Sequence, residues 1–216
     1  MSVPPSGFIA FDYDGTLVDS LSANLRITNE VCVGLSGCRP ITRSDIENLD
    51  RMSFEEIAEV VGIPSSEVSL CLEEINRRII ASYSELDFFP GIVDALRGLR
   101  GDGWDLYVVT HNTEVAVSGL LETNGLSGCF SGILGAETGL PKDAKLASLV
   151  EVRGAVSSEC AMFGDSVGDI DATKSAGIVS VGVSWGYQSR SRLEEASPDF
   201  IIDAPEDVLS IVRGLR

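Results

Sequence analysis

Two aspartates, Asp12 and Asp14, directly follow an apolar run in the segment GFIAFDYDGTLVDS, residues 7–20. A run that is apolar on both faces is typical of a strand in the middle of a parallel sheet. Because such sheets bind ligands at the carboxyl ends of their strands, Asp12 stands where chemistry is expected. Two carboxylates about 4 Å apart repel by roughly 4 kcal/mol at an effective dielectric near 20. The pair therefore predicts a bound cation or a shared proton.

Polar side chains also follow two later apolar segments. Thr110 ends the predicted strand DLYVV, and Asp165 follows CAMFG, with Asp169 four residues further on. The segment GLPKDAK between them carries Lys142 and Lys145, two of only three lysines in the chain. Since the carboxyl ends of parallel strands meet in one crevice, we expect these groups to lie near the first aspartates.

The elements that position these residues are of two kinds. Residues 20–86 show apolar residues at helical spacings and no strand alternation, which predicts an all-helical insert. Leu21 begins the first of these helices and Gly37 ends it, and Ser53 with Glu56 forms the capping-box pattern of another. A longer amphipathic run follows over residues 66–86.

From residue 92 onward, helical and strand patterns alternate. This alternation predicts an α/β fold with a doubly wound parallel sheet, interrupted by the helical insert just after the first strand. We expect helices over 92–99, 114–123, 143–152 and 169–176, strands over 105–109, 160–163, 178–183 and 199–202, a short segment around Ile133, and a final helix with Asp203 as its N-cap.

Composition limits the classes of partner and compartment. The 216 residues have a formal net charge of −17 and are 44% hydrophobic, which fits a folded protein and argues against nucleic-acid binding. No apolar run approaches the roughly 20 residues that a membrane span needs. Five cysteines without a CxxC pair, and no cationic apolar leader before Gly7, predict a cytoplasmic protein. An anionic substrate would need a locally positive pocket.

The ordered set DYDGT, Thr110, Lys142 and GDSVGD resembles the four motifs of the haloacid dehalogenase superfamily, in its phosphoglycolate phosphatase-like group. The segments FPGIVDALRGLRGDGWDLYVVT and GDIDATKSAG are also similar to that group. The resemblance runs from about residue 8 to the C-terminus. It implies a Rossmann-like core domain of residues 1–18 and 88–216, with a small α-helical cap domain of residues 19–87.

The resemblance also implies roles that agree with the chemistry of the residues. Asp12 resembles the nucleophile that attacks phosphorus and forms an aspartyl-phosphate, which splits a slow hydrolysis into two easier steps. Asp14 resembles the general acid that protonates the leaving alkoxide and then, as base, activates water. Thr110 and Lys142 would bind the oxygens of the transferring phosphoryl group.

Attack of a carboxylate on a phosphate brings two anions together, so a cation is needed. By resemblance this is Mg²⁺, bound by Asp12, the Asp14 backbone carbonyl and Asp165, which offer the hard oxygens that it prefers. Asp169 is expected to orient metal-bound water or to ligate directly. A small-molecule phosphate monoester is the implied partner, with phosphoglycolate a first guess, and no nucleic acid or membrane is implied.

Three assignments depend on single residues. The residue after the second-motif threonine is commonly Asn in these phosphatases, whereas here it is His111, the chain's one histidine, a candidate for substrate contact. Arg51 is the candidate for substrate recognition from the insert. Lys142 is favoured over Lys145 because it stands 23 residues before Asp165, close to the usual separation. Lys145 is expected one turn deeper, paired with a neighbouring acid and tolerant of substitution like a surface residue.

Other functions remain as alternatives. Asp14 argues against a dehalogenase, which lacks the second acid, and a phosphonatase would add a cap lysine that residues 20–86 do not contain. A sugar-phosphate mutase keeps all four motifs and is the second interpretation. A phospho-receiver signalling module, from a different class, would be phosphorylated once rather than turn over. Substrate identity and oligomeric state are left open by the sequence.

Overall fold

Six parallel strands form one sheet in a computed structural model that describes residues 6–49, 53–82 and 86–215. The strand order is β3-β2-β1-β4-β5-β6, and every neighbouring pair is parallel. The strands are β1 (Phe8–Phe11), β2 (Asp105–Val109), β3 (Gly132–Leu134), β4 (Ala161–Gly164), β5 (Val179–Val183) and β6 (Phe200–Ile202). The predicted parallel α/β sheet is confirmed, and its first strand lies at the centre.

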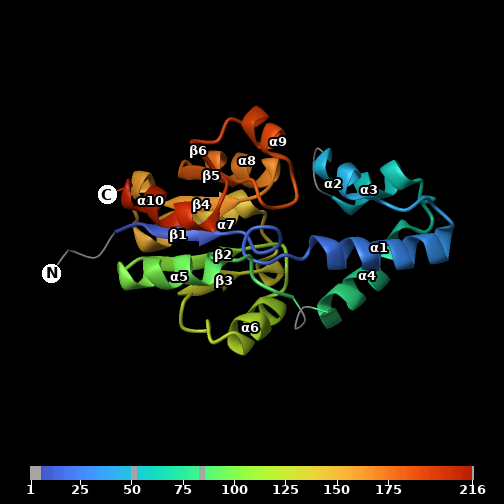
Figure 1. Ribbon diagram of the computed structural model, residues 1–216, viewed down its shortest axis with the longest axis horizontal. Coiled ribbons are helices and arrows are strands. Elements are labelled where there is room, and N and C mark those ends of the chain that lie inside the picture. Colours follow the sequence, from blue (N-terminus) through green and yellow to red (C-terminus); the bar gives the residue numbers. More distant parts are fainter. Residues whose placement is uncertain (1–5, 50–52, 83–85, 216) are drawn as a thin grey trace.

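Helices cover both faces of this sheet (Figure 1). They are α5 (Ile92–Gly101), α6 (Glu114–Thr123), α7 (Lys142–Arg153), α8 (Val167–Ser175), α9 (Arg190–Glu195) and α10 (Val208–Arg213). Side chains of β1 alternate between two hydrophobic clusters, as the period of a strand requires. Ile9 and Phe11 pack in the cluster that includes residues of α5, α6 and α10, whereas Phe8 and Ala10 pack with Leu146 of α7. The sheet is therefore doubly wound.

Strand register brings the polar strand ends to one edge. Phe11 pairs with Val108 of β2 on one side and with Phe163 of β4 on the other. The residues that follow these three strands are consequently neighbours at the carboxyl edge of the sheet. All four residues of β1 are buried, which explains why the strand carries no polar side chain before Asp12.

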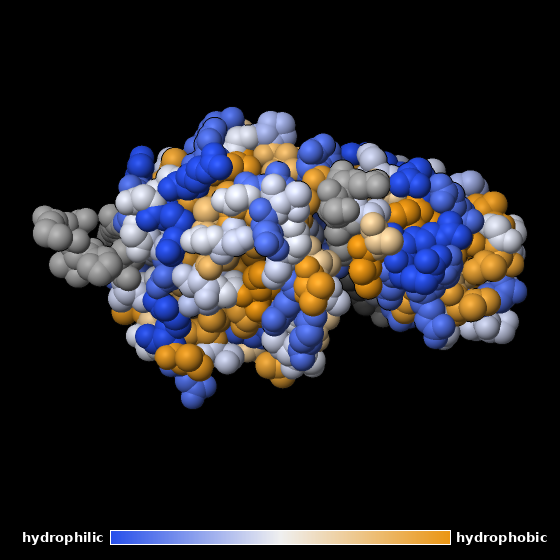
Figure 2. All heavy atoms as spheres, turned by 90° about the horizontal axis from the view of Figure 1, so that it is seen from below, coloured by the Kyte–Doolittle hydropathy of each residue, from blue (hydrophilic) through white to orange (hydrophobic). Residues whose placement is uncertain are grey.

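A second group of helices lies between β1 and β2 in the sequence and to one side of the sheet (Figure 1). These are α1 (Leu21–Ser36), α2 (Arg43–Glu47), α3 (Phe54–Val61) and α4 (Val68–Ser82). They bury a hydrophobic cluster of their own, in which Val31 of α1 and Ile75 of α4 take part. In Figure 2 this smaller helical part lies beside the larger sheet-containing part, with hydrophilic side chains over both. The domain limits near residues 18 and 87 stay a prediction.

Local signals explain the ends of these helices. Gly37 ends α1 with φ of 65°, a left-handed conformation that favours glycine, and Ser53 caps α3 by accepting the amide of Glu56. The sequence analysis missed the short helix α2, although Thr42 and Asp45 form a complete capping box at its start.

The C-terminal helix begins later than predicted. A 3₁₀ turn over Pro205–Asp207 precedes α10, so Asp203 is not its N-cap. The carboxylate of Asp203 instead accepts hydrogen bonds from Ser184 and Arg190. Within the described residues, none of the helices combines the length and the apolar character needed to cross a membrane.

Candidate active site

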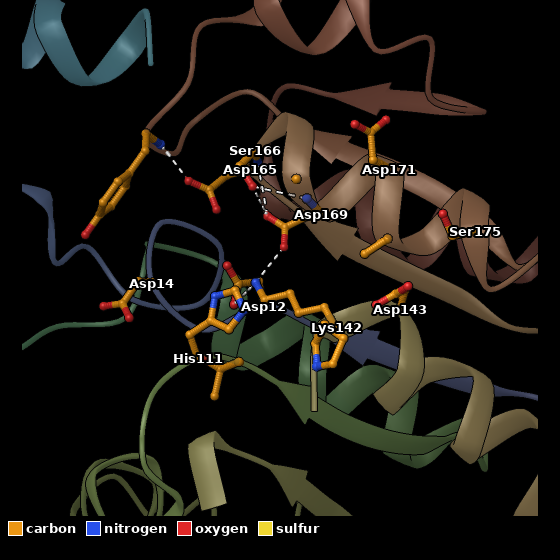
Figure 3. A pocket seen from close by; sticks show the side chains of 15 residues that line it. Asp12, Asp14, His111, Lys142, Asp143, Asp165, Ser166, Asp169, Asp171 and Ser175 are labelled. Atoms are coloured by element: carbon orange, nitrogen blue, oxygen red, sulfur yellow. Dashed lines mark hydrogen bonds and ion pairs between the residues drawn. The ribbon is translucent and has the colours of Figure 1, made fainter. Parts of the chain in front are cut away.

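Four elements contribute charged or polar side chains to one pocket at the carboxyl edge of the sheet (Figure 3). Asp12 follows β1, Thr110 follows β2, Asp165 follows β4, and Lys142 is the first residue of α7. The cavity that they line has a volume of about 480 Å³. The structure thus brings together the residues that the sequence analysis placed at the strand ends.

Lys142 lies at the centre of this pocket, between two carboxylates. Its Nζ atom is 2.8 Å from Oδ1 of Asp12 and donates a 2.6 Å hydrogen bond to Oδ1 of Asp169. Burial by itself would lower the pKa of this amine, but the charges of the two aspartates raise it above its ordinary value. The side chain is therefore a fixed positive charge in the anionic pocket.

Asp12, Asp165 and Asp169 present carboxylate oxygens that all lie within 4.8 Å of one another. Burial, followed by the mutual repulsion of the acids, raises the pKa of Asp165, and burial raises that of Asp12 to about 7 despite the nearby Lys142. Among the described residues, these three crowded carboxylates have one ammonium partner, Lys142, and are short of positive charge. Their hard oxygen atoms fit a divalent cation such as Mg²⁺.

Asp165 is held in place by a cradle of backbone and hydroxyl groups. Thr16 donates from Oγ1 to its Oδ1 at 3.1 Å, and the amide of Tyr187 donates to its Oδ2 at 2.7 Å. Gly15 has φ of 75°, and a Cβ there would lie 2.1 Å from Oδ2 of Asp165. A Cβ on Gly186 would lie 2.3 Å from Asp165 Cβ. The loops after β1 and β5 therefore need glycine to approach this carboxylate.

Asp169 is oriented by the start of its own helix. It forms a capping box with Ser166, whose Oγ donates to its Oδ2 at 2.6 Å. Its other oxygen accepts from Lys142. A Cβ on Gly164 would lie 2.3 Å from Asp169 Cβ, so the end of β4 leaves room for this side chain. Asp169 thus fixes the position of the lysine.

The side chain of Asp14 points away from that of Asp12 and has different hydrogen-bond partners (Figure 3). Ser20 donates from Oγ to its Oδ1 at 2.6 Å, and Asn112 donates from Nδ2 to its Oδ2. Burial raises the pKa of Asp14 to about 6, although the Ser20 hydrogen bond and the charge of Lys142 oppose this. Asn112 was missed by the sequence analysis, which looked for an amide one residue earlier, at His111.

The predicted acidic partner of Lys145 was wrong, although the residue does lie one helical turn beyond Lys142. Its side chain is 1% exposed and donates from Nζ to the backbone carbonyl of Thr110 at 2.7 Å, so its partner is a carbonyl and not an acid. Burial and then the charge of Lys142 lower its pKa. The reason is that α7 packs against β2, which turns this face of the helix inward. Thr110 also accepts the amide of Asn112 at Oγ1.

The two other candidate substrate contacts have different outcomes. His111 lines the pocket although the residue as a whole is exposed, and partial burial of its ring, followed by the charges of Lys142 and Lys145, lowers its pKa. The Arg51 candidate lies outside the described residues.

A chain of hydrogen bonds joins the helical part to Asp14. Asn24 of α1 lies 2.8 Å from the hydroxyl of Tyr187, which lies 2.8 Å from Oγ of Ser20. While Asp14 is ionised, Ser20 gives its one hydroxyl proton to this carboxylate, so Tyr187 donates to Ser20 and Asn24 donates to Tyr187. Sequence reasoning missed this chain, since Tyr187 and Ser20 are 167 positions apart and no motif links them.

Comparisons with known proteins find relatives that match over most of the chain. The family model described as "Haloacid dehalogenase-like hydrolase" matches residues 9–183. A phosphoglycolate phosphatase of Synechococcus elongatus is 30% identical over 96% of this chain and 97% of its own length.

Two solved structures share the fold. A haloacid dehalogenase-like family hydrolase from Streptococcus pneumoniae superposes with a TM-score of 0.83 and 22% identity, over 95% of this chain and 98% of its own. A candidate beta-phosphoglucomutase from Thermotoga maritima has a TM-score of 0.70 and 22% identity, over 97% of this chain and 100% of its own. At these identities the two structures bear on the fold alone.

Proposed function

The chain belongs to the haloacid dehalogenase-like hydrolase family, and on that premise we propose that it is a Mg²⁺-dependent phosphatase of small phosphate monoesters. The observation that carries the proposal is that two neighbouring acids, Asp12 and Asp14, are held in place by different partners. Asp12 is held by Lys142 among the three clustered carboxylates, whereas Asp14 is held by Ser20 and Asn112. Two acids with different surroundings can take different roles in one reaction.

In the proposed reaction Asp12 is the nucleophile. One of its oxygens is 2.8 Å from the Lys142 ammonium, which leaves the other to attack phosphorus and form an aspartyl-phosphate. The same ammonium and the Thr110 side chain are proposed to bind the oxygens of the phosphoryl group, because both residues line the pocket. Asp169 and Ser166 keep the lysine in position and are positioning residues.

Asp14 moves the proton in both steps. Its pKa of about 6 allows the carboxyl to be protonated when the substrate binds, so that it can protonate the leaving alkoxide. As a carboxylate it then takes a proton from the water that attacks the aspartyl-phosphate. Ser20 and Asn112 keep its oxygens away from Asp12, which prevents the two acids from sharing one proton.

Asp12 and Asp165 are the proposed side-chain ligands of Mg²⁺, together with the Asp14 backbone carbonyl, and Asp169 lies within the same group of carboxylates. When bound, the ion neutralises charge that develops on the phosphoryl oxygens. The raised pKa of Asp12 and of Asp165 supports such a site, because buried carboxylates without a cation resist ionisation.

A sugar-phosphate mutase is the alternative that uses the same residues. The relative from Synechococcus elongatus favours hydrolysis, whereas the neighbour named as a mutase shares the fold only. The distinction lies in the product, because a phosphatase releases inorganic phosphate and a mutase returns an isomeric phosphate ester. A phospho-receiver module would take up one phosphoryl group per chain without turnover.

The test is the release of inorganic phosphate from p-nitrophenyl phosphate and from a panel of phosphorylated metabolites. We expect repeated turnover in Mg²⁺, complete loss in excess EDTA and recovery when Mg²⁺ is added back. Phosphate release at the full rate in metal-free buffer would contradict the metal assignment, and a single phosphorylation per chain would contradict the enzymatic function.

A further inference from the structure

The side chain of Tyr187, in the loop after β5, lies against the start of α1. Its hydroxyl group is 2.8 Å from Oγ of Ser20, which precedes α1, and 2.8 Å from Nδ2 of Asn24 within α1. The backbone amide of the same residue donates to Oδ2 of Asp165. Tyr187 therefore contacts one of the clustered carboxylates with its main chain and the hydrogen-bond chain to Asp14 with its side chain.

The direction of this hydrogen-bond chain is the same whether Asp14 is ionised or protonated. Nδ2 of Asn24 carries two protons and no lone pair, so it can only donate to the Tyr187 hydroxyl. Among the described residues, that hydroxyl has Ser20 as its one acceptor and gives its proton there. Ser20 is then left with Asp14 as the acceptor for its own hydroxyl proton. The amide of Asn24 thus fixes the direction of each hydrogen bond up to the acid.

This direction decides where the proton of Asp14 points when the carboxyl group is protonated. Ser20 donates to Oδ1 and Asn112 donates to Oδ2, so both oxygens already accept a hydrogen bond. A hydroxyl group that donates its one proton to an oxygen does not accept a proton from that oxygen in the same contact. The acid proton is therefore directed into the pocket that Asp14 lines, where the proposed reaction places the leaving oxygen.

We propose, as a deepening that rests on the proposed phosphatase function, that Tyr187 is a positioning residue for proton transfer to the leaving group. Its hydroxyl group keeps the Ser20 proton directed at Asp14, so that Asp14 gives its own proton to the leaving oxygen and becomes a carboxylate. Without that hydroxyl group nothing holds the Ser20 proton on the side of the acid. Oγ of Ser20 can then accept the acid proton, which turns it away from the substrate.

Two aryl esters of similar shape measure this role in the presence of Mg²⁺. Phenolate needs a proton on departure far more than p-nitrophenolate does, and kcat/KM reports only the steps up to that departure. Tyr187→Phe should lower kcat/KM for phenyl phosphate by about tenfold, the effect of one charge-assisted hydrogen bond. For p-nitrophenyl phosphate the fall should be less than about twofold. The matched control is Tyr107→Phe, which removes a hydroxyl group that contacts Arg153 away from the pocket and should keep both rates.

A double-mutant cycle shows whether Tyr187 acts through Ser20. In the Ser20→Ala background, Tyr187→Phe should have no further effect on kcat/KM for phenyl phosphate. Tyr187 also lines the pocket, so an equal effect in both backgrounds would assign it a direct contact with the substrate and overturn the proposal. Asn24→Ala removes the amide that fixes the direction of the chain, and should lower kcat/KM for phenyl phosphate more than for p-nitrophenyl phosphate. If Tyr187→Phe does not fold, Asn24→Ala carries the same test.

The outcomes separate this inference from the function that it rests on. Absence of p-nitrophenyl phosphate turnover by the wild-type protein in Mg²⁺ contradicts the proposed function. Normal turnover by the wild type, with an unchanged ratio of the two kcat/KM values in Tyr187→Phe, overturns only the positioning role of Tyr187. A larger fall for phenyl phosphate that disappears in the Ser20→Ala background supports it, because a residue that merely stabilised the loop would affect both esters equally.

Discussion

Asn112 donates a hydrogen bond from its side-chain amide to Oδ2 of Asp14, which ties the loop after β2 to the loop after β1. The amide follows His111 and thus lies one residue beyond the position where the resemblance led us to expect an asparagine. An amide that donates to a carboxylate stabilises the charged form. This contact therefore affects both the direction and the proton affinity of the proposed acid.

Asn112→Ala should lower kcat and raise the pKa of Asp14, because the carboxylate loses a donor while Ser20 remains. The alkaline limb of the pH profile of kcat/KM, which reports deprotonation of the general acid in the free enzyme, should then move to higher pH. The control is Asn124→Ala, at the end of α6, whose side chain donates to the Leu120 carbonyl away from the site. A lower kcat without any movement of the pH profile would assign Asn112 a structural role only.

Asp12→Asn should abolish turnover and formation of a phosphoenzyme, because an amide cannot act as the nucleophile. Asp14→Asn removes only proton transfer, an effect of typically 10²- to 10⁴-fold. The second variant should keep a residual rate with p-nitrophenyl phosphate, whose leaving group needs little protonation. Steady-state kinetics with this substrate compare the two, and higher activity in Asp12→Asn would reverse the assignment.

Mg²⁺ should stabilise the folded protein more at pH 8 than at pH 5. The folded-state pKa of about 7 for Asp12 exceeds its ordinary value of 3.8, so the metal-free folded state binds more protons than the unfolded state between these values. The contribution of the Asp12 carboxyl group to the stability of the metal-free protein therefore falls as pH rises from about 4 to about 7. A cation bound to the ionised carboxylates offsets this loss.

Thermal unfolding in EDTA and in Mg²⁺ at the two pH values measures this effect without substrate. Asp12→Asn is the matched variant, because its side chain does not ionise. Relative to the wild type in EDTA it should gain stability as pH rises through this window. An equal rise in Tm with Mg²⁺ at pH 5 and pH 8 would be inconsistent with binding to these carboxylates.

Several residues of the site could be predicted because each of them directly follows a strand. The hydrogen bonds that support these residues could not be predicted. Asp12, Thr110 and Asp165 each come directly after an apolar strand, so a local pattern and the rule for parallel sheets bring them together. The contact between Tyr187 and Ser20 depends on how the loop after β5 folds over the start of α1, and no local pattern records that. Asp203 shows the opposite error. Its residue type and its place near a helix predicted an N-cap, whereas its carboxylate accepts a hydrogen bond from Ser184.

Gly164→Ala should disturb the site through Asp169. A Cβ at this position would lie 2.3 Å from Asp169 Cβ, and both residues are buried. Overpacking of this kind costs about 1–3 kcal/mol of stability and should displace the partner of Lys142, which lowers kcat. Gly119→Ala in α6 is the control, since its Cβ would meet no atom within 4 Å. Equal stability and activity in both variants would contradict the expected clash.

The two buried lysines of α7 provide the sharpest test of the site. Lys142→Ala removes the ammonium between Asp12 and Asp169, and with it the charge proposed to stabilise the transition state. We expect kcat to fall by about 10²- to 10³-fold, as when a donor to a developing anion is deleted. The variant Lys142→Arg keeps the charge but not the compact geometry, and should recover only part of the rate.

Lys145→Met retains an unbranched stem of similar length but leaves the Thr110 carbonyl without its donor. Because the side chain is 1% exposed, we now expect a loss of about 1–3 kcal/mol in the free energy of unfolding instead of the negligible effect predicted from sequence. Its kcat should fall less than that of Lys142→Ala, since the ammonium of Lys145 bonds a carbonyl and not a carboxylate of the site. Urea unfolding and steady-state kinetics of both variants decide the matter, and a larger fall in kcat for Lys145→Met would transfer the phosphoryl-binding role to Lys145.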